Sequence, residues 1–73
     1  MRRYCVNREP GPRGKHQVHD VTDANRSCLP KPANRVMIGG ERTSSFSAFV
    51  SALLKYRGRA DGCAHCMPEC HRG

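Results

Sequence analysis

The segment DGCAHCMPECHRG, residues 61–73, places three cysteines and two histidines within thirteen residues. Thiolate and imidazole are the groups that hold structural zinc, which takes four such ligands at the corners of a tetrahedron. Cys63 and Cys66 are separated by two residues, so one tight turn can aim both sulfurs at a point about 2.3 Å from each. This turn supplies half of a metal site. The other two ligands must come from the same segment or from upstream.

Four residues can complete the site: Cys70 and His71 in the same segment, and Cys28 and His19 upstream. Cys66 and Cys70 stand at positions i and i+4, so their thiolates share a face if the tail turns helical. Two ligand sets follow. The first choice is Cys28, Cys63, Cys66 and Cys70. The second takes His19 in place of Cys70 and gives a site of three cysteines and one histidine.

The size of the chain favours a structural role for such a site. With 73 residues, we expect residues 1–73 to form a single small metal-binding domain, and the large apolar residues are few. Domains of this size usually need disulfides, a metal or a partner chain in addition to their core. The odd count of five cysteines and the absence of an apolar run after Met1 point to a reduced, cytoplasmic protein without a membrane segment. We therefore expect zinc rather than disulfides.

Other uses of the cysteines fit the sequence less well. Haem attachment through Cys-x-x-Cys-His would need histidine where Met67 stands, and the ferredoxin spacing of cysteines is absent. A thioredoxin-like motif needs a βαβ context that the chain is too short to provide. Glu69 is the only carboxylate between Cys63 and His71, and no His-Glu-x-x-His motif occurs. An enzyme is therefore less expected than a closed structural site.

Patterns upstream predict a small α+β fold. Alternation indicates short strands at residues 1–7 and 16–21, and β-branched and apolar residues indicate a third at 35–38. The three can form a small antiparallel sheet of about three strands. One amphipathic helix follows, ended by Gly58, and the cysteine turn forms a C-terminal zinc knuckle. The apolar stripe of this helix is expected to pack on the sheet, with a partner-binding face as the alternative. Its members are Phe46, Phe49, Val50, Leu53 and Leu54.

The charge of the chain bears on its partners. Thirteen Lys and Arg against six Asp and Glu give a formal net charge of +7, spread without a run of five cations. A basic small domain attracts polyanions, so contact with nucleic acid is one expectation and contact with a protein partner is the other. A homodimer is a further option because so small a core invites pairing.

A set of motifs along nearly the whole chain resembles a family of short bacterial proteins of uncharacterised function. The motifs are Tyr4-Cys5-Val6-Asn7, His16-Gln17-Val18-His19, Cys28-Leu29-Pro30, Asn34, Gly39 and residues 62–71. The resemblance implies a compact α+β metal-binding module. This chain departs from the family in having additional residues between His19 and Cys28 and between Cys66 and Cys70. The second departure weakens Cys70 as a ligand and favours His19.

The order of the same motifs is more distantly similar to the zinc domain of the bacterial adaptive-response alkylation repair protein. In that domain a thiolate bound to zinc accepts a methyl group from DNA phosphate. The similarity implies that Cys28 is the candidate for such chemistry, because a metal keeps its ligand sulfur in the thiolate form. This is the alternative to a purely structural role, and likeness of fold does not establish it.

Overall fold

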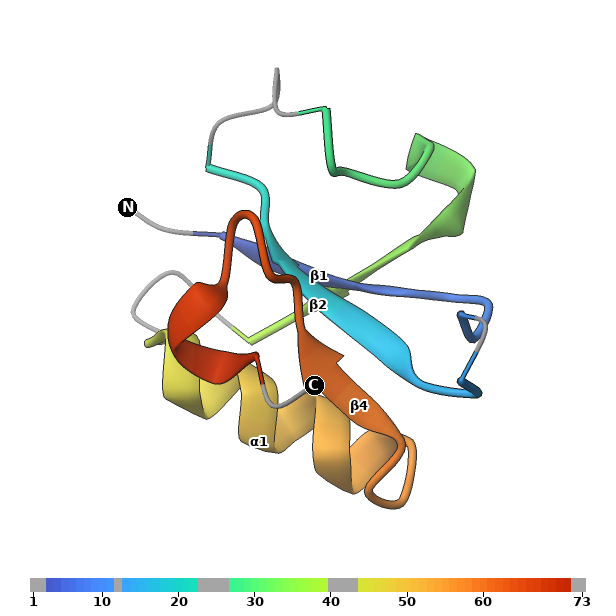
Figure 1. Cartoon of the computed structure of the whole chain (residues 1–73), viewed down its shortest axis with the longest axis vertical. Coiled ribbons are helices and arrows are strands. Elements are labelled where there is room, and N and C mark those ends of the chain that lie inside the picture. The colour runs from blue at the N-terminus through green and yellow to red at the C-terminus, as the bar shows by residue number, and fades with distance from the viewer. Residues whose placement is uncertain (1–2, 12, 23–26, 40–43, 72–73) are drawn as a thin grey trace.

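The computed structural model describes residues 3–11, 13–22, 27–39 and 44–71. Within these residues the elements in chain order are β1 (Tyr4–Asn7), β2 (His16–Asp20), β3 (Arg35–Ile38), α1 (Ser45–Lys55) and β4 (Ala60–Gly62) (Figure 1). Two short 3-10 turns, Pro32–Asn34 and Pro68–Cys70, precede β3 and follow β4. The α+β class expected from the sequence is confirmed.

The sheet is mixed, and its strands lie in the order β3-β1-β2-β4. β1 pairs antiparallel with both β2 and β3, whereas β4 pairs in parallel with the outer edge of β2. The sequence predicts about three antiparallel strands, so the fourth strand is a correction. The three residues of β4, Ala60–Gly62, include a glycine and show no alternation. They form a strand only because they pair with β2. This strand leads the chain directly into the cysteine turn.

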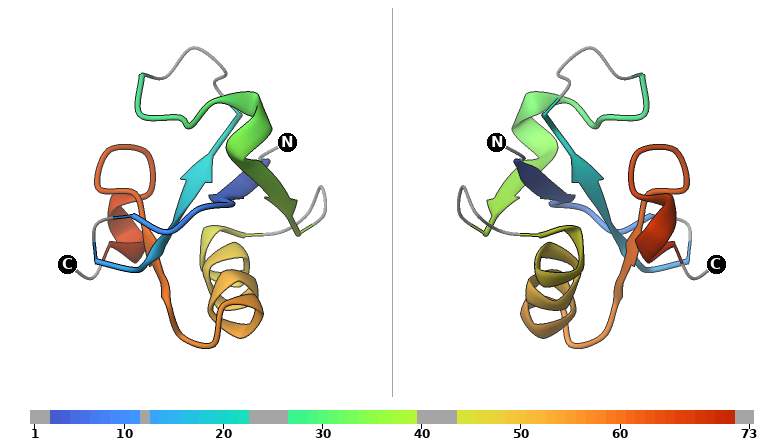
Figure 2. Two further views of the ribbon diagram at one scale, coloured as in Figure 1. Left: turned by 90° about the vertical axis from the view of Figure 1, so that its right-hand side faces the viewer. Right: turned by 90° about the vertical axis from the view of Figure 1, so that its left-hand side faces the viewer.

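Side chains of the sheet alternate between two faces. Tyr4, Val6 and Val18 are buried in the core cluster on the face that α1 covers. Cys5 is also fully buried but lies outside that cluster, directly opposite His19 in the β1–β2 register. Residues 27–34 run on the side of the sheet away from α1 (Figure 2). The sheet therefore separates an apolar core under the helix from a second face that carries His19.

The helix buries a different face from the one that the sequence predicts. Ser44 caps it by accepting a hydrogen bond from the Ser47 amide at 3.1 Å. The side chains buried against the sheet are Ala48, Phe49 and Ala52. Of the expected stripe, Phe46 and Leu54 are instead 60% and 78% exposed. The two alanines explain the rotation, because small side chains let the helix approach the sheet closely while Phe49 fills the core.

Gly62 allows the C-terminal turn to fold back onto β4. A Cβ at this position would lie 2.7 Å from the backbone carbon of Cys70 and 2.8 Å from the carbonyl oxygen of Met67. Met67 itself is fully buried, and the Cys70 amide donates to its carbonyl at 3.0 Å. The close approach brings Cys63, Cys66, Met67 and Cys70 into the core. No helix in the described part of the chain is long and apolar enough to cross a bilayer.

Candidate metal centre

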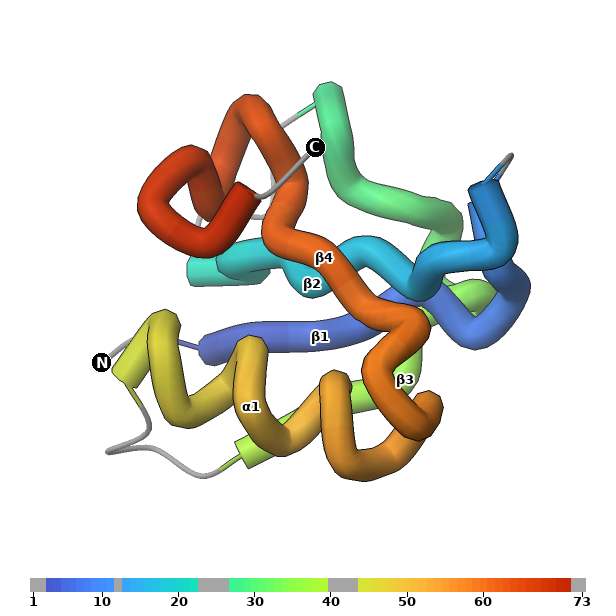
Figure 3. Tube along the Cα trace, turned by 60° about the horizontal axis from the view of Figure 1, so that its bottom comes forward, coloured from blue at the N-terminus to red at the C-terminus, as the bar shows by residue number. Residues whose placement is uncertain are grey.

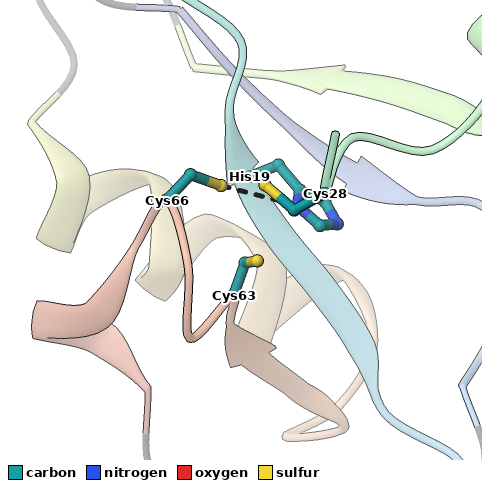
Figure 4. A group of neighbouring side chains, drawn as sticks. All are labelled: His19, Cys28, Cys63 and Cys66. Carbon is teal, nitrogen blue, oxygen red and sulfur yellow. Dashed lines mark hydrogen bonds between the residues drawn. The ribbon is translucent and has the colours of Figure 1, made fainter. Parts of the chain in front are cut away.

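Four side chains from distant parts of the sequence converge at one end of β2. His19, Cys28, Cys63 and Cys66 each offer one nitrogen or sulfur atom, and these atoms all lie within 4.8 Å of one another (Figure 4). His19 belongs to β2, Cys28 to the segment that follows it, and the other two to the turn after β4. Three thiols and one imidazole at this separation form a donor set that can hold one metal ion.

Parallel pairing of β4 with β2 places Cys63 beside His19. The register matches Val18 with Gly62, and the Cys63 amide continues the ladder by donating to the Val18 carbonyl at 2.9 Å. Since side chains alternate along a strand, the next residue of each chain points to the same face. The fourth strand, which the sequence does not predict, is thus the element that joins the cysteine turn to the histidine.

The turn from Cys63 to Cys66 directs amide groups at the first sulfur. The backbone amides of Cys66 and His65 hydrogen-bond to the Cys63 sulfur, and the Met67 amide donates to the Cys63 carbonyl at 2.8 Å. Burial alone would raise the pKa of Cys63, but the amides and the neighbouring thiols of Cys66 and Cys28 lower it below its ordinary value. Cys63 is therefore the sulfur best prepared to carry negative charge.

Cys66 differs from Cys63 because its surroundings favour the neutral thiol. Burial raises its pKa to about 12, assisted by the thiol of Cys28 and the charge of Cys63, although the Asp20 amide donates to its sulfur at 3.4 Å. Without a cation, the cluster therefore favours one thiolate over two. A bound divalent ion reverses this preference, because it takes the place of the protons and neutralises the sulfurs.

Asn7 fixes the orientation of the His19 ring. The ring nitrogen Nε2 lies 3.0 Å from the Asn7 side-chain oxygen, which can only accept, so Nε2 carries the proton. The other nitrogen, Nδ1, then presents a lone pair toward the Cys66 sulfur at 3.6 Å. Burial and the charge of Arg35 lower the pKa of His19, which keeps the ring neutral. A neutral ring anchored through its second nitrogen is the usual arrangement of a metal-binding histidine.

Cys28 reaches the centre from residues 27–34 and differs from its companions in exposure. It is half-buried, whereas His19, Cys63 and Cys66 are buried. The Arg35 guanidinium donates to the Pro30 carbonyl at 2.8 Å and so ties this segment to the start of β3. The centre therefore has one side that is partly open to solvent, and Cys28 lies on it.

The structure does not bring the predicted ligands Cys70 and His71 into the cluster. The Cys70 thiol lies 3.7 Å from the Ser45 carbonyl at the start of α1, and it is buried in the core. The His71 ring donates to the Gly62 carbonyl at 3.0 Å and lies 3.5 Å from an Asp61 carboxylate oxygen. The expected helical tail is a 3-10 turn in the structure, and it directs Cys70 away from Cys66. Of the two ligand sets, the structure assembles the one that contains His19.

Two residues that support the centre carry no metal-ligand signal in the sequence. Asn7 occurs in the motif Tyr4-Cys5-Val6-Asn7, but its contact with His19 depends on strand pairing. Asp20 acts through its backbone amide, which any residue supplies. Cys5 is not a member of the cluster, and burial raises the pKa of its thiol to about 11.

Neither a protein-family model nor a curated protein nor a solved structure matches this chain. The resemblance drawn from the motifs stays an expectation. The function is therefore inferred from the residues of the centre and from their surroundings.

Proposed function

We propose that this chain is a small metal-binding module that holds one zinc ion through His19, Cys28, Cys63 and Cys66. The convergence of their four ligand atoms within 4.8 Å carries the proposal. Zinc suits the donor set because it binds thiolate and imidazole in a tetrahedron without preferring another geometry. Hard cations such as magnesium and calcium bind oxygen ligands instead.

The role proposed for the ion is structural. Four protein ligands fill a tetrahedral site and leave no position for water or substrate, in contrast to the three ligands of catalytic zinc. The ligands join β2, the Cys28 segment and the C-terminal turn, which are separated by as many as 47 residues between His19 and Cys66. When bound, the ion contributes its binding free energy to folding.

The binding free energy of the ion matters for folding because the apolar core is small. The largest fully buried side chains are only Tyr4, Met67, His19, Val6, Val18 and Cys5. Structural zinc contributes about 10–16 kcal/mol of apparent binding free energy in small modules. The net stability of an ordinary domain is about 5–15 kcal/mol. The ion is therefore expected to decide whether this chain folds.

The exposure of Cys28 supports a second candidate function, which is thiolate chemistry such as methyl acceptance. Cys28 is the one ligand of the four that is only half-buried. In this reaction its sulfur attacks a methyl carbon, the S–C bond forms and the bond from carbon to the leaving group breaks. Mass spectrometry of the zinc-loaded chain after exposure to methyl iodide tests it. A methyl group confined to Cys28 supports the second candidate, and an unmodified Cys28 removes it.

Cobalt substitution combined with native mass spectrometry tests the principal proposal. Native spectra with and without a chelator should show one divalent ion per chain that the chelator removes. Co²⁺ in the same site should give the visible bands of tetrahedral coordination, and His19→Ala should change them. Retention of no ion, or spectra of the cobalt form unchanged by His19→Ala, would contradict the proposed ligand set.

A further inference from the structure

The β1–β2 connection lies beside the turn between α1 and β4, away from the metal centre (Figures 1 and 3). Four cationic residues belong to these two segments and to the adjoining end of α1: Lys15, Lys55, Arg57 and Arg59. The last three are exposed and Lys15 is half-buried. Within the described residues, none of these four side chains forms an ion pair. We call this set the basic end.

Contacts through His16 hold the two halves of the basic end together. The His16 amide donates to the Arg59 carbonyl at 2.8 Å, and its ring stacks on Tyr56 with 3.7 Å between ring centres and 8° between planes. The ring nitrogen Nδ1 lies 2.8 Å from the Asn7 carbonyl, which fixes its orientation. This fixed aromatic pair therefore lies beside the backbone of Arg59, and the Lys55 ammonium nitrogen lies 5.9 Å from the centre of the Tyr56 ring.

Among the residues that the structure describes, few acidic groups oppose this charge. Asp61 is buried and accepts a hydrogen bond from the Gly62 amide at 2.9 Å, so it does not reach the surface. Glu9 is exposed and belongs to the β1–β2 connection, but within the described residues it forms no ion pair with the four cations. An uncompensated group of cations attracts polyanions, and phosphate groups are the common source of such charge.

Arg57 adds an observation that stability does not explain. Arg57 lies two residues after the last residue of α1 and adopts the left-handed conformation, with φ of 53°. The amide of the following Gly58 donates to the Leu53 carbonyl at 2.7 Å. Glycine is the usual residue at this helix end, since a side chain there is strained. Strain of this kind concentrates at functional sites. An arginine at the position where glycine would be more stable suggests that its charge is used.

We propose that the basic end binds single-stranded nucleic acid, with phosphates at Lys55, Arg57 and Arg59 and bases against the His16–Tyr56 pair. Proteins that bind single strands combine cations along the backbone with aromatic rings on which bases stack. A duplex hides the faces of its bases, so the aromatic pair would then contribute nothing. The proposal requires the folded chain but not a particular ion in the metal centre.

Fluorescence anisotropy of a labelled oligothymidylate with the full-length, zinc-loaded chain tests this inference. The logarithm of the affinity should fall linearly with the logarithm of salt concentration, with a slope of about −0.7 for each phosphate contact on a single strand. A strand of equal length without bases should bind about tenfold more weakly for each stacked base lost. An affinity that is insensitive to salt, equal for the baseless strand, or higher for the matching duplex would overturn the proposal.

The substitution Arg57→Gly separates binding from folding. It should weaken binding and reduce the salt slope by about 0.7, while the melting temperature stays the same or rises because the strain is relieved. Lys31→Gln is the control, since Lys31 is also an exposed cation but belongs to residues 27–34, on the side of the sheet away from α1. It should leave both affinity and slope unchanged. An equal loss for Lys31→Gln, or no loss for Arg57→Gly, would contradict the assignment of the basic end.

Discussion

The substitutions Cys28→Ser and Cys70→Ser exchange sulfur for oxygen at two positions to which the structure gives different roles. Cys28 is half-buried in the cluster, whereas Cys70 is 3% exposed and packs in the core near the Ser45 carbonyl. Stability arguments alone would make the more deeply buried position the more sensitive one. Metal binding predicts the reverse order, because only Cys28 is a ligand.

General energetics give the size of the two effects. A binding free energy of about 10–16 kcal/mol shared by four ligands assigns about 2.5–4 kcal/mol to each. Loss of the Cys28 sulfur should thus weaken zinc binding by about 50- to 1,000-fold. In Cys70→Ser the hydroxyl can donate to the Ser45 carbonyl in place of the thiol, so the stability cost should be about 1–2 kcal/mol.

Competition with a chromophoric zinc chelator measures the affinity of both variants, and thermal unfolding in excess zinc measures their stability. Cys28→Ser should lose zinc at chelator concentrations that leave Cys70→Ser loaded. If both variants release the ion, the set without His19 becomes the better account, and if Cys28→Ser retains the ion, both ligand sets are wrong, because each contains Cys28.

Three further predictions follow from the contacts around the centre. Asn7→Ala should lower zinc affinity by about 10–100-fold in the same competition assay, because the His19 ring loses its anchor, and unchanged affinity would contradict this role. Gly62→Ala should lower stability by about 1–3 kcal/mol in thermal unfolding, since its Cβ meets the Cys70 backbone; a melting temperature equal to that of the parent would refute the close approach. The pKa of Cys5 is raised from 9.0 to about 11 by burial, so the unfolded chain loses this proton first and stability should fall as pH rises from about 9 to about 11. Cys5→Ala should flatten that part of a pH-dependent denaturation series, and an identical slope in the variant would exclude Cys5 as its source.

Local sequence patterns were sufficient for much of the fold. The third strand has the bounds that its β-branched and apolar residues predict, Arg35–Ile38, and one helix follows it as expected. Strand β4 was not predicted because its partner, β2, lies some 40 residues upstream, so that no local pattern contains the pairing. The buried face of α1 differed because hydrophobicity favours Phe46 and Leu54, whereas the fit to the sheet selects Ala48 and Ala52.

The candidate centre shows the same division between local and distant information. The spacing of Cys63 and Cys66 identifies the turn without any tertiary information. The choice between His19 and Cys70 depends on the path of the chain after Cys66, where a 3-10 turn directs Cys70 into the core. Spacing alone permits both. Supporting contacts such as that of Asn7 depend on strand register, which no short motif contains.

Circular dichroism of the fully reduced chain, recorded during thermal unfolding before and after zinc is removed, tests the central claim most directly. We expect the zinc-loaded chain to unfold in one cooperative transition and the stripped chain to lack both the transition and the native spectrum. Readdition of one equivalent of zinc should restore both. A stripped, reduced chain that keeps its spectrum and its melting temperature would show that the fold does not depend on a metal.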